Sequence, residues 1–421
     1  MKIKFISNAC AIFESDKGTK ILSDPWIVNG VFEGSWCHFH KLETKIEDLQ
    51  DVDAIYVSHI HPDHYDERFF DFSREIPIIV LDHGLNFLHK KLIEKGYKNL
   101  IKVKDKQTIN FKDIKISLFA PFVKHVFFGN NTKIGNLIDS AIVLESDNQV
   151  VFNANDNNPD NLSCELLKER FEKIDLAMIN YNNAGPYPSC FNNLTDEEKL
   201  KEHQSNLKRN IDFLASNLEI LQPKFFLPFA GAYVIGGKLH YKNNYLGTTT
   251  WDDCIERLQL NNSLKRIDFI ALREKDIFDI TNKKLLQEYI PINNMEVNSY
   301  IKEELSKLIY PYEEDDYPSI KTLKNDLEIS KSKLEERIEK IKIVPDMDVN
   351  LELDNEELWN VVKAKNKKGV LNCKIDLRLL RRIIDRKSHW NNAEIGCHIE
   401  FYRTPNYYSP DIHTMMQFFH L

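Results

Sequence analysis

The chain has 421 residues, which is too long for one ordinary globular domain and indicates a main body with a smaller second unit. Hydrophobic residues make up 42% of the chain and aromatic residues 11%, so we expect a folded protein without extensive disorder. The formal net charge is −8 and basic residues are interspersed with acidic ones, which excludes the basic surface that nucleic-acid binding requires.

The N-terminal sequence and the cysteines indicate the compartment. Polar residues interrupt the apolar runs of residues 1–18, and the chain holds no apolar stretch of about 18 residues, so we expect neither a signal peptide nor a transmembrane segment. The seven cysteines are scattered without C-x-x-C spacing, which predicts reduced thiols rather than a disulfide framework or a zinc knuckle. We therefore expect a cytoplasmic protein.

Residues 1–285 alternate short β-type runs with helical stretches, as expected for one large domain. Two pairs of runs, within residues 10–24 and 140–154, are separated by polar turns and predict β-hairpins. The clearest helix is expected over residues 195–218, where a Thr-x-x-Glu capping box precedes apolar residues at helical spacing. Sheets covered by helices predict an α/β or α+β sandwich.

The sequence changes character after residue 285. Residues 286–345 are expected to form a helical linker or extension, and residues 346–421 a smaller C-terminal α+β domain. The extension contains one apolar stripe, made of Leu323, Leu327, Leu334, Ile338 and Ile341. We interpret this stripe as a helix packing on its own domain; a dimerising coiled coil remains the alternative, although the stripe is shorter than about four heptads.

Four candidate metal ligands follow a buried-strand run. They are His59, His61, Asp63 and His64. Because side chains two apart in an extended strand point the same way, His59 and His61 can bind one ion. Pro62 then turns the chain, which directs Asp63 and His64 toward a neighbouring ion. So many ligand side chains in so short a segment indicate a metal site rather than a purely structural cluster.

This His-x-His-x-Asp-His motif at a strand end resembles the signature of the metallo-β-lactamase superfamily, which implies an αββα sandwich. Residues 21–26, Ile-Leu-Ser-Asp-Pro-Trp, resemble a strand end of the branch that contains the N-acyl-phosphatidylethanolamine phospholipase D and lactonase-like proteins. Residues 229–233, Phe-Ala-Gly-Ala-Tyr, are most similar to the non-Rieske part of CMP-N-acetylneuraminate hydroxylases. The resemblance covers roughly residues 1–250.

The resemblance implies two metal ions and further ligands. His125 completes the first site with His59 and His61, and Asp156 bridges the two ions. The second site takes Asp63, His64 and a last histidine late in the fold. His240 is our choice for that ligand, and His83 is the competing candidate.

The sequence departs from the family at several points. The Gly-Asp-Thr common around the bridging aspartate is Asn-Asp-Asn at residues 155–157, and the N-terminal Gly-His is Asn-Ala at residues 8–9. A Rieske centre needs paired C-x-H and C-x-x-H elements. Cys37 and His40 supply a C-x-x-H, but no C-x-H partner lies at a workable distance, so we do not expect Rieske chemistry from this chain alone.

We predict a binuclear metal-dependent hydrolase that acts on a small, anionic phosphodiester, lactone or amide substrate through metal-activated hydroxide. Asp63 is the predicted catalytic residue, since it holds the second ion and takes up a proton. Zinc is the expected metal, with iron and manganese as alternatives, because imidazole and carboxylate ligands suit all three. The alternative function is a di-iron oxidoreductase or oxygenase on the same fold, acting on a nucleotide-sugar or related metabolite. The sequence leaves the oligomeric state open, a homodimer included.

Two weaker features concern substrate binding. Residues 181–188 follow a predicted strand and are interpreted as a functional loop, with a plain connector as the alternative. Arg378, Arg382 and Arg386 are spaced for one helical face that would bind a carboxylate or phosphate, with Arg403 as a further member; a solvated face is the alternative.

Overall fold

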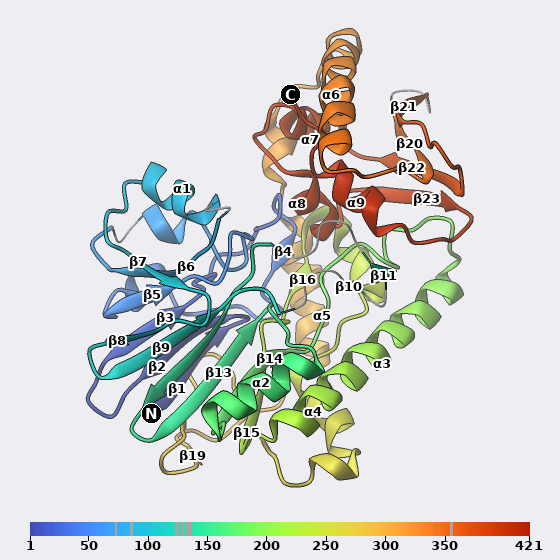
Figure 1. Cartoon of the computed structure of the whole chain (residues 1–421). Helices are drawn as coiled ribbons and strands as arrows, with labels where there is room; N and C mark the ends of the chain where they lie inside the picture. The colour runs from blue at the N-terminus through green and yellow to red at the C-terminus, as the bar shows by residue number, and fades with distance from the viewer. Residues whose placement is uncertain (72–73, 85–86, 123–125, 128–129, 132–136, 354–356) are drawn as a thin grey trace.

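The chain folds into a sandwich of two large mixed sheets with a third, four-stranded sheet at one end (Figure 1). This computed structural model describes all residues except 72–73, 85–86, 123–125, 128–129, 132–136 and 354–356. Both large sheets contribute apolar side chains to one core between them, as Phe13 and Tyr56 of the first sheet and Val143 and Phe152 of the second illustrate. Burial of this apolar surface is the main stabilising contribution to the sandwich.

The first sheet has eight strands in the order β19-β18-β1-β2-β3-β5-β6-β7. In chain order they are β1 (Lys2–Ser7), β2 (Cys10–Glu14), β3 (Lys20–Ser23), β5 (Ala54–Tyr56), β6 (Ile78–Asp82), β7 (Leu100–Lys104), β18 (Ile277–Asp279) and β19 (Lys284–Leu285). The hairpin expected within residues 10–24 is confirmed, since β2 and β3 pair antiparallel with Ala11 opposite Ser23. The strands β3, β5, β6 and β7 run parallel, so their carboxyl ends lie along one edge.

The second sheet has seven strands in the order β17-β15-β14-β13-β12-β9-β8. In chain order they are β8 (Thr108–Phe111), β9 (Ile114–Phe119), β12 (Ala141–Ser146), β13 (Gln149–Asn155), β14 (Leu176–Asn180), β15 (Phe225–Phe229) and β17 (Asp268–Phe269). The second predicted hairpin is also confirmed, because β12 and β13 pair antiparallel around the turn at Asp147 and Asn148. Both turn residues have positive φ, which Asp and Asn tolerate better than most residues.

Helices cover the outer faces of both sheets. On the first sheet lies α1 (Phe87–Glu94), whose Leu92 is buried with Ile55 and Ile78. On the second lie α2 (Asn161–Phe171), α3 (Asp196–Leu221) and α4 (Trp251–Gln259). The capping box predicted for α3 is confirmed: Thr195 accepts from the backbone of Glu198, whose side chain accepts from the backbone of Thr195. The result is the αββα arrangement that the resemblance implied.

Shorter elements complete the sandwich. They are β4 (Trp36–Cys37) paired with β16 (Val234–Ile235), β10 (Val126–Phe127) paired with β11 (Asn130–Asn131), and the 3-10 helices η1 (Ile46–Leu49), η2 (Phe69–Asp71), η3 (Gly237–Tyr245) and η4 (Asn262–Leu264). No helix in the described part of the chain combines the length and the apolar character needed to cross a membrane.

The segment expected as one extension, 286–345, divides between two neighbours. The helix α5 (Asn294–Glu303) and η5 (Leu305–Lys307) pack on the sandwich core, where Ile301 and Leu305 are buried. After η6 (Pro311–Glu314), α6 (Ile320–Lys340) packs instead on the C-terminal residues. The interpretation of the apolar stripe is confirmed: Leu323, Leu327, Leu334 and Ile338 are buried within the chain, and Ile341 is partly buried beside them.

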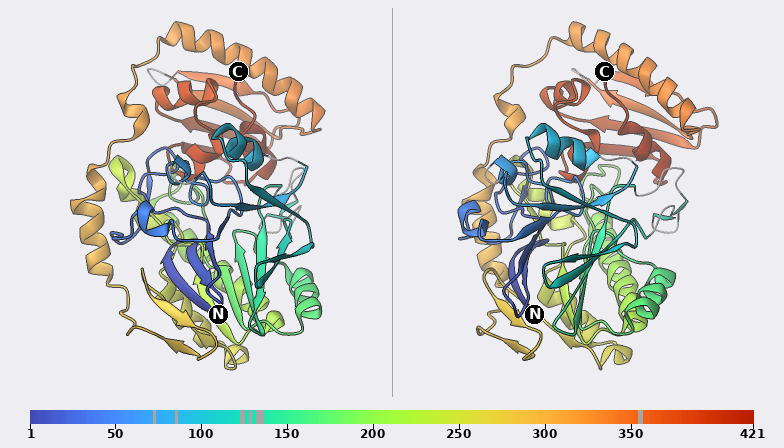
Figure 2. Two further views of the ribbon diagram at one scale, coloured as in Figure 1. Left: turned by 90° about the vertical axis from the view of Figure 1, so that its left-hand side faces the viewer. Right: turned by 60° about the vertical axis from the view of Figure 1, so that its left-hand side comes forward.

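The C-terminal unit consists of one sheet in the order β21-β20-β22-β23 with α6 and three short helices. Its elements are β20 (Met347–Glu352), β21 (Leu358–Val362), β22 (Gly369–Lys374), α7 (Leu377–Ile384), α8 (Trp390–Ile395), β23 (Glu400–Thr404) and α9 (Pro410–Met416). In both views of Figure 2 the unit caps the end of the sandwich opposite the N-terminus.

The C-terminal unit and the sandwich share one continuous apolar core. This core includes Trp36, Phe191 and Tyr233 from the sandwich, together with Trp390 and Phe401 from the C-terminal unit. The rings of Trp36 and Tyr233 stack at a centroid distance of 3.5 Å, and those of Phe191 and Phe401 at 5.0 Å. The two units are therefore packed together rather than joined by a linker alone.

Truncating the apolar stripe of α6 tests this packing. We expect Leu327→Ala to lower the free energy of unfolding by about 2–5 kcal/mol, because Leu327 is fully buried and its truncation leaves a cavity. Ile329→Ala on the same helix is the control, since Ile329 is 49% exposed and its truncation should cost far less. Urea denaturation followed by circular dichroism measures both; equal losses would contradict the orientation of α6.

His398 joins the two units in its neutral form. Its Nε2 donates to the backbone oxygen of Phe32 at 3.0 Å, so Nδ1 is the acceptor for the Tyr312 hydroxyl at 3.2 Å. Burial lowers the pKa of His398 to about 3 from its usual 6.5. The unfolded chain therefore binds a proton below pH 6.5 that the folded chain does not bind until about pH 3.

We expect His398 to make the protein lose stability on acidification, by up to about 1.4 kcal/mol per pH unit between pH 6.5 and 3. His398→Gln keeps a donor and an acceptor but does not titrate, so its stability should fall less steeply over that interval. Urea unfolding at several pH values measures the two slopes. Parallel curves for the two proteins would show that His398 is not held neutral.

Candidate metal centre

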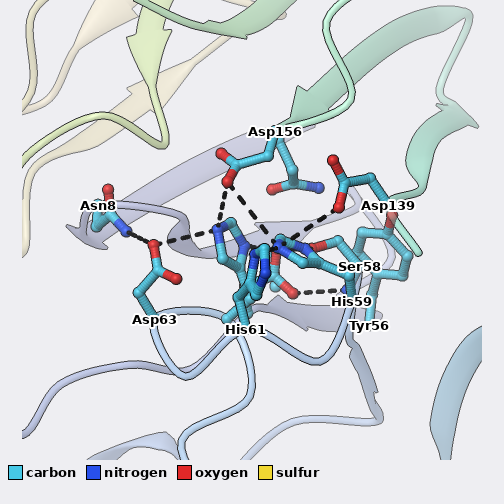
Figure 3. A network of polar contacts seen from close by, with 12 residues as sticks. Asn8, Tyr56, Ser58, His59, His61, Asp63, Asp139 and Asp156 are labelled. Atoms are coloured by element: carbon cyan, nitrogen blue, oxygen red, sulfur yellow. Dashed lines mark hydrogen bonds and ion pairs between the residues drawn. The ribbon is translucent and has the colours of Figure 1, made fainter. Parts of the chain in front are cut away.

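The segment 59–64 lies at the edge of the first sheet, where β5 ends at Tyr56 and the chain leaves the sheet. Two carboxylates reach the same place from the second sheet: Asp139 stands just before β12, and Asp156 follows β13 directly. Figure 3 shows the side chains of His59, Asp139 and Asp156 pointing toward one another. The site is thus assembled between the ends of the two sheets.

His59, His61 and Asp139 form the first group of potential ligands. Nε2 of His59 lies 2.8 Å from Nδ1 of His61 and 3.6 Å from Oδ1 of Asp139. One ligand atom of each residue lies within 4.8 Å of the other two. These separations suit one ion whose bonds to nitrogen and oxygen are about 2 Å long.

His59, His64 and Asp156 form the second group, with Asp63 alongside. Nε2 of His64 lies 3.4 Å from Oδ2 of Asp156 and 3.3 Å from Oδ2 of Asp63. Oδ2 of Asp156 also lies 3.9 Å from Nε2 of His59, so this carboxylate stands between the two groups. Within the described part of the chain, the buried Nε2 of His64 has no hydrogen-bond partner, as expected for a nitrogen directed at a metal ion.

Hydrogen bonds on the outer side of the rings fix two of the imidazoles. Nδ1 of His64 donates to Oδ2 of Asp24 at 2.9 Å. The Ser58 hydroxyl donates to the same oxygen at 2.8 Å, so it accepts from Nδ1 of His59 at 2.9 Å. In the neutral form that metal ligands require, both imidazoles therefore carry their proton on Nδ1 and present Nε2 on the side of the carboxylates.

The third imidazole has the opposite arrangement. Nε2 of His61 lies 3.1 Å from Oδ1 of Asn391, and Nδ1 faces His59. The carboxylates are held as well: Asn180 donates to Oδ1 of Asp156 at 2.8 Å, and Asn8 donates to Oδ2 of Asp63 at 3.3 Å. Every imidazole of the site thus has a partner on the side that faces away from the other ligands.

The electrostatics of the site call for a cation. Burial by itself lowers the pKa of His64, but the carboxylates of Asp63, Asp156 and Asp24 hold that pKa well above its usual value. Burial lowers the pKa of His59, and the charges of His64 and His61 lower it further. Divalent ions would also compensate the negative charge of the carboxylates, and all three imidazoles could then stay neutral.

The structure brings together most of the predicted ligands, namely His59, His61, Asp63, His64 and Asp156. His125 lies outside the described residues. Neither His240 nor His83 belongs to the two groups found among the described residues. His240 lies in η3 with Nδ1 3.1 Å from the backbone oxygen of Gly237, whereas His83 lines a small cavity beside His59.

Asp139 is the potential ligand that the sequence reasoning missed. The resemblance directed attention to a histidine after β9, whereas the structure offers a carboxylate just before β12. Its signal in the sequence is weak. Asp139 precedes β12, and β12 pairs with β13, the strand that leads to Asp156. Ser140 beside it donates to the backbone oxygen of Ser58 at 2.7 Å. This hydrogen bond connects Asp139 to the residue that precedes the segment 59–64.

Two motifs of the sequence resemblance support the site. Asp24, from the Asp-Pro pair after β3, holds His64 and Ser58 as described above. Residues 229–233 position Asn8: the backbone amides of Ala230 and Ala232 each donate to Asn8 at 3.1 Å, and Asn8 in turn contacts Asp63. The Asn-Ala at the N-terminal position therefore contributes a hydrogen bond to a potential ligand.

The predicted loop 181–188 is tied to the site through asparagines. The backbone amide of Asn182 donates to Oδ1 of Asn180 at 2.9 Å, and Asn180 contacts Asp156. The side chain of Asn182 donates to the backbone oxygen of Gly231 at 2.7 Å. These contacts favour a structural link to the site over a plain connector.

The arginines of the C-terminal unit have partners within the chain. Arg378 binds Asp376 at 2.8 Å, and Arg382 binds Asp315 at 2.8 Å. The helix α7 ends at Ile384, so Arg386 does not continue its face. The guanidinium of Arg403 lies over the Phe191 ring at 4.5 Å. The expected anion-binding face is therefore occupied by intramolecular ion pairs.

No protein-family model matches the chain. Among curated proteins, it is 29% identical over 201 residues to a "Putative Rieske 2Fe-2S iron-sulfur protein" of Mycolicibacterium smegmatis, covering 45% of this chain and 36% of that protein. It is 23% identical over 275 residues to the cytidine monophosphate-N-acetylneuraminic acid hydroxylase of Cricetulus griseus, covering 63% of this chain and 45% of the hydroxylase. The chain thus spans less than half the length of either relative.

Among solved structures, the isothiocyanate hydrolase from Delia radicum gut bacteria matches with a TM-score of 0.46 and 18% identity, covering 66% of this chain and 99% of the hydrolase. The fold follows from the chain's own features: two mixed sheets, outer helices on both faces, and His59, His61, Asp63 and His64 at a strand end. These define the metallo-β-lactamase fold. The sequence match to the hydroxylase concerns the part of that protein outside its Rieske domain.

Weakening the support of His64 tests the metal centre. We expect Asp24→Asn to reduce the affinity for a divalent metal by roughly 10- to 100-fold, because the amide accepts less strongly from Nδ1 of His64 and the ring loses orientation. Asp71→Asn is the control, since the side chain of Asp71 is 60% exposed. Calorimetric titration of metal-free protein with Zn²⁺ measures both. An unchanged affinity of the Asp24 variant would contradict the role of Asp24 in orienting His64.

Proposed function

We propose that the protein is a binuclear metal-dependent hydrolase acting on a small anionic substrate with a phosphodiester, lactone or amide bond. The observation that carries this proposal is the convergence of three imidazoles and three carboxylates on one place. In this proposal His59, His61 and Asp139 hold the first ion, Asp63 and His64 hold the second, and Asp156 lies between them.

Two divalent ions held by these residues would supply Lewis acidity and would lower the pKa of bound water toward neutrality. Asp63 then serves as the proton acceptor next to the attacking water, while its Oδ2 keeps the hydrogen bond from Asn8. Asn180 holds Asp156 in place through Oδ1, so Oδ2 stays directed at the two histidine groups. The protein itself needs no side-chain nucleophile for this reaction.

The charge of the centre supports an anionic substrate. Three carboxylates and three neutral imidazoles would leave two divalent ions with net positive charge until hydroxide binds, and this charge would attract an anionic substrate. Zinc, iron and manganese all suit these nitrogen and oxygen donors. The cysteines among the described residues do not belong to either ligand group.

One observation favours a second candidate, a di-iron oxidoreductase. His59, His61 and Asp139 form a two-histidine, one-carboxylate set, and such a set binds a single iron(II) ion in non-haem oxygenases. One sequence relative is a hydroxylase by name, although this chain covers 45% of that protein. Asp139 therefore distinguishes the two candidates better than any other residue of the site.

Metal analysis and a substrate screen test the leading proposal. We expect protein purified without air to carry two metal ions per chain and to hydrolyse a phosphodiester, lactone or amide. His61→Ala should lower both metal content and activity, the latter by more than about 100-fold, because a lost ligand costs more than a lost hydrogen bond to one. Full metal content in this variant would exclude His61 as a ligand.

Asp139→His separates the two functions. In a hydrolase the added imidazole still binds zinc or manganese, so activity should fall by roughly 10-fold at most. In a di-iron oxygenase the loss of the carboxylate should remove the visible iron absorption and the consumption of dioxygen. Iron content with an absorption band in the unaltered protein, together with loss of both in the variant, would replace the leading proposal by the second.

A further inference from the structure

One contact to the metal centre comes from outside the sandwich. Oδ1 of Asn391, in α8 of the C-terminal unit, lies 3.1 Å from Nε2 of His61, although the two residues are 330 positions apart. The other side chains that support the imidazoles, Asp24 and Ser58, belong to the first sheet or the segment that follows it. Among the described residues, the hydrogen bond to Nε2 of His61 therefore comes from the C-terminal unit and not from the sandwich.

The chemistry of this contact sets the state of His61. An amide oxygen only accepts, so Nε2 of His61 carries a proton, and in the neutral ring Nδ1 then carries the lone pair. Nδ1 is the nitrogen that lies 2.8 Å from Nε2 of His59, inside the first group of ligands. A rotated ring, or the other tautomer, would direct an N–H at the ion instead.

The position of Asn391 is fixed from both of its sides. Nδ1 of His389 accepts from the backbone amide of Asn391 at 3.3 Å, which starts α8, and the adjacent Trp390 is buried in the shared core. At the other end of α8, the Trp36 indole donates to the backbone oxygen of Ile395 at 3.1 Å. The helix therefore cannot shift without disturbing the junction between the two units.

The same junction also encloses His61. The Phe32 ring lies 6.2 Å from the His61 ring, and the backbone oxygen of Phe32 accepts from His398 of the C-terminal unit. Ser35, three residues on, donates to the backbone oxygen of Gly396 at 2.8 Å. The segment 32–36 is thus held between His61 and the C-terminal unit.

We infer that the C-terminal unit is part of the metal centre, and that Asn391 is the positioning residue that keeps Nδ1 of His61 directed at the first ion. This inference rests on the proposed metal-dependent function. A neutral amide suits the role, since it fixes the tautomer without adding a fourth carboxylate to a site that already holds three. Asp24 orients His64 in the same way, with a carboxylate instead of an amide as the acceptor.

The test compares three variants of the full chain. Asn391→Leu removes the acceptor at similar size, Asn391→Asp restores an acceptor, and Asn392→Leu is the matched control on the next residue of α8. Calorimetric titration with Zn²⁺ should show two ions in the unaltered protein, and Asn391→Leu should weaken one of them roughly 10- to 100-fold. Asn391→Asp and Asn392→Leu should stay within about threefold of the unaltered protein, well inside the effect of a lost support.

A second readout does not need a metal. In ¹⁵N-histidine NMR spectra of the metal-free protein, His61 should be protonated on Nε2, and Asn391→Leu should shift it toward a mixture of tautomers. Thermal unfolding followed by circular dichroism shows whether each variant keeps its fold, and Asn391→Ala replaces Asn391→Leu if the larger side chain perturbs α8.

The outcomes separate this inference from the proposed function. Unchanged zinc affinity and an unchanged tautomer in a folded Asn391→Leu would overturn the role of Asn391 and leave the metal centre intact. An unaltered protein that takes up no metal would overturn the proposed function. In that case the tautomer spectra would still decide whether Asn391 controls His61.

Discussion

The concentration of negative charge beside three imidazoles, those of His59 and His64 buried, is the constraint on which the rest of the site depends. Asp63, Asp139 and Asp156 approach His59 and His64 within 3.3 to 3.9 Å. Such a cluster is costly to bury unless a cation compensates it. In the metal-free chain, the raised pKa of His64 provides part of this compensation. Divalent ions provide it more completely, so the folding of this region and the binding of metal are expected to be linked.

The packing of the two sheets brings these histidines and carboxylates together. The segment 59–64, which carries the histidines, leaves the first sheet after the parallel strand β5. Asp139 and Asp156 lie at the ends of β12 and β13 in the second sheet. Packing the two sheets over one core aligns these ends (Figure 3). Ligands on strand ends are positioned more rigidly than ligands on long loops, which suits a centre that must hold two ions at a short separation.

The C-terminal unit is packed against the sandwich and is not an independent appendage. Its core is continuous with that of the sandwich through Trp36, Phe191 and Tyr233, and its sheet stands at the end of the sandwich opposite the N-terminus (Figure 2). A unit that packs so closely affects the geometry of its neighbour. The contact between Asn391 and His61 makes that connection direct, so the metal centre belongs to the whole chain rather than to the sandwich alone.

The sequence alone determined the sandwich architecture, both hairpins, the capped helix α3 and the four-residue ligand motif, because these depend on local spacing, turn chemistry and periodicity. It also gave Asp156 through a resemblance. It did not reveal Asp139 or Asn391, and it did not show that, within the expected extension 286–345, α5 packs on the sandwich core and α6 on the C-terminal residues. Each of these depends on which distant segments meet: Asp139 faces His59 only because two sheets pack, and Asn391 faces His61 only because α8 docks against residues 32–36. Such contacts between distant segments leave no periodic pattern in a single sequence, and only the tertiary structure decides them.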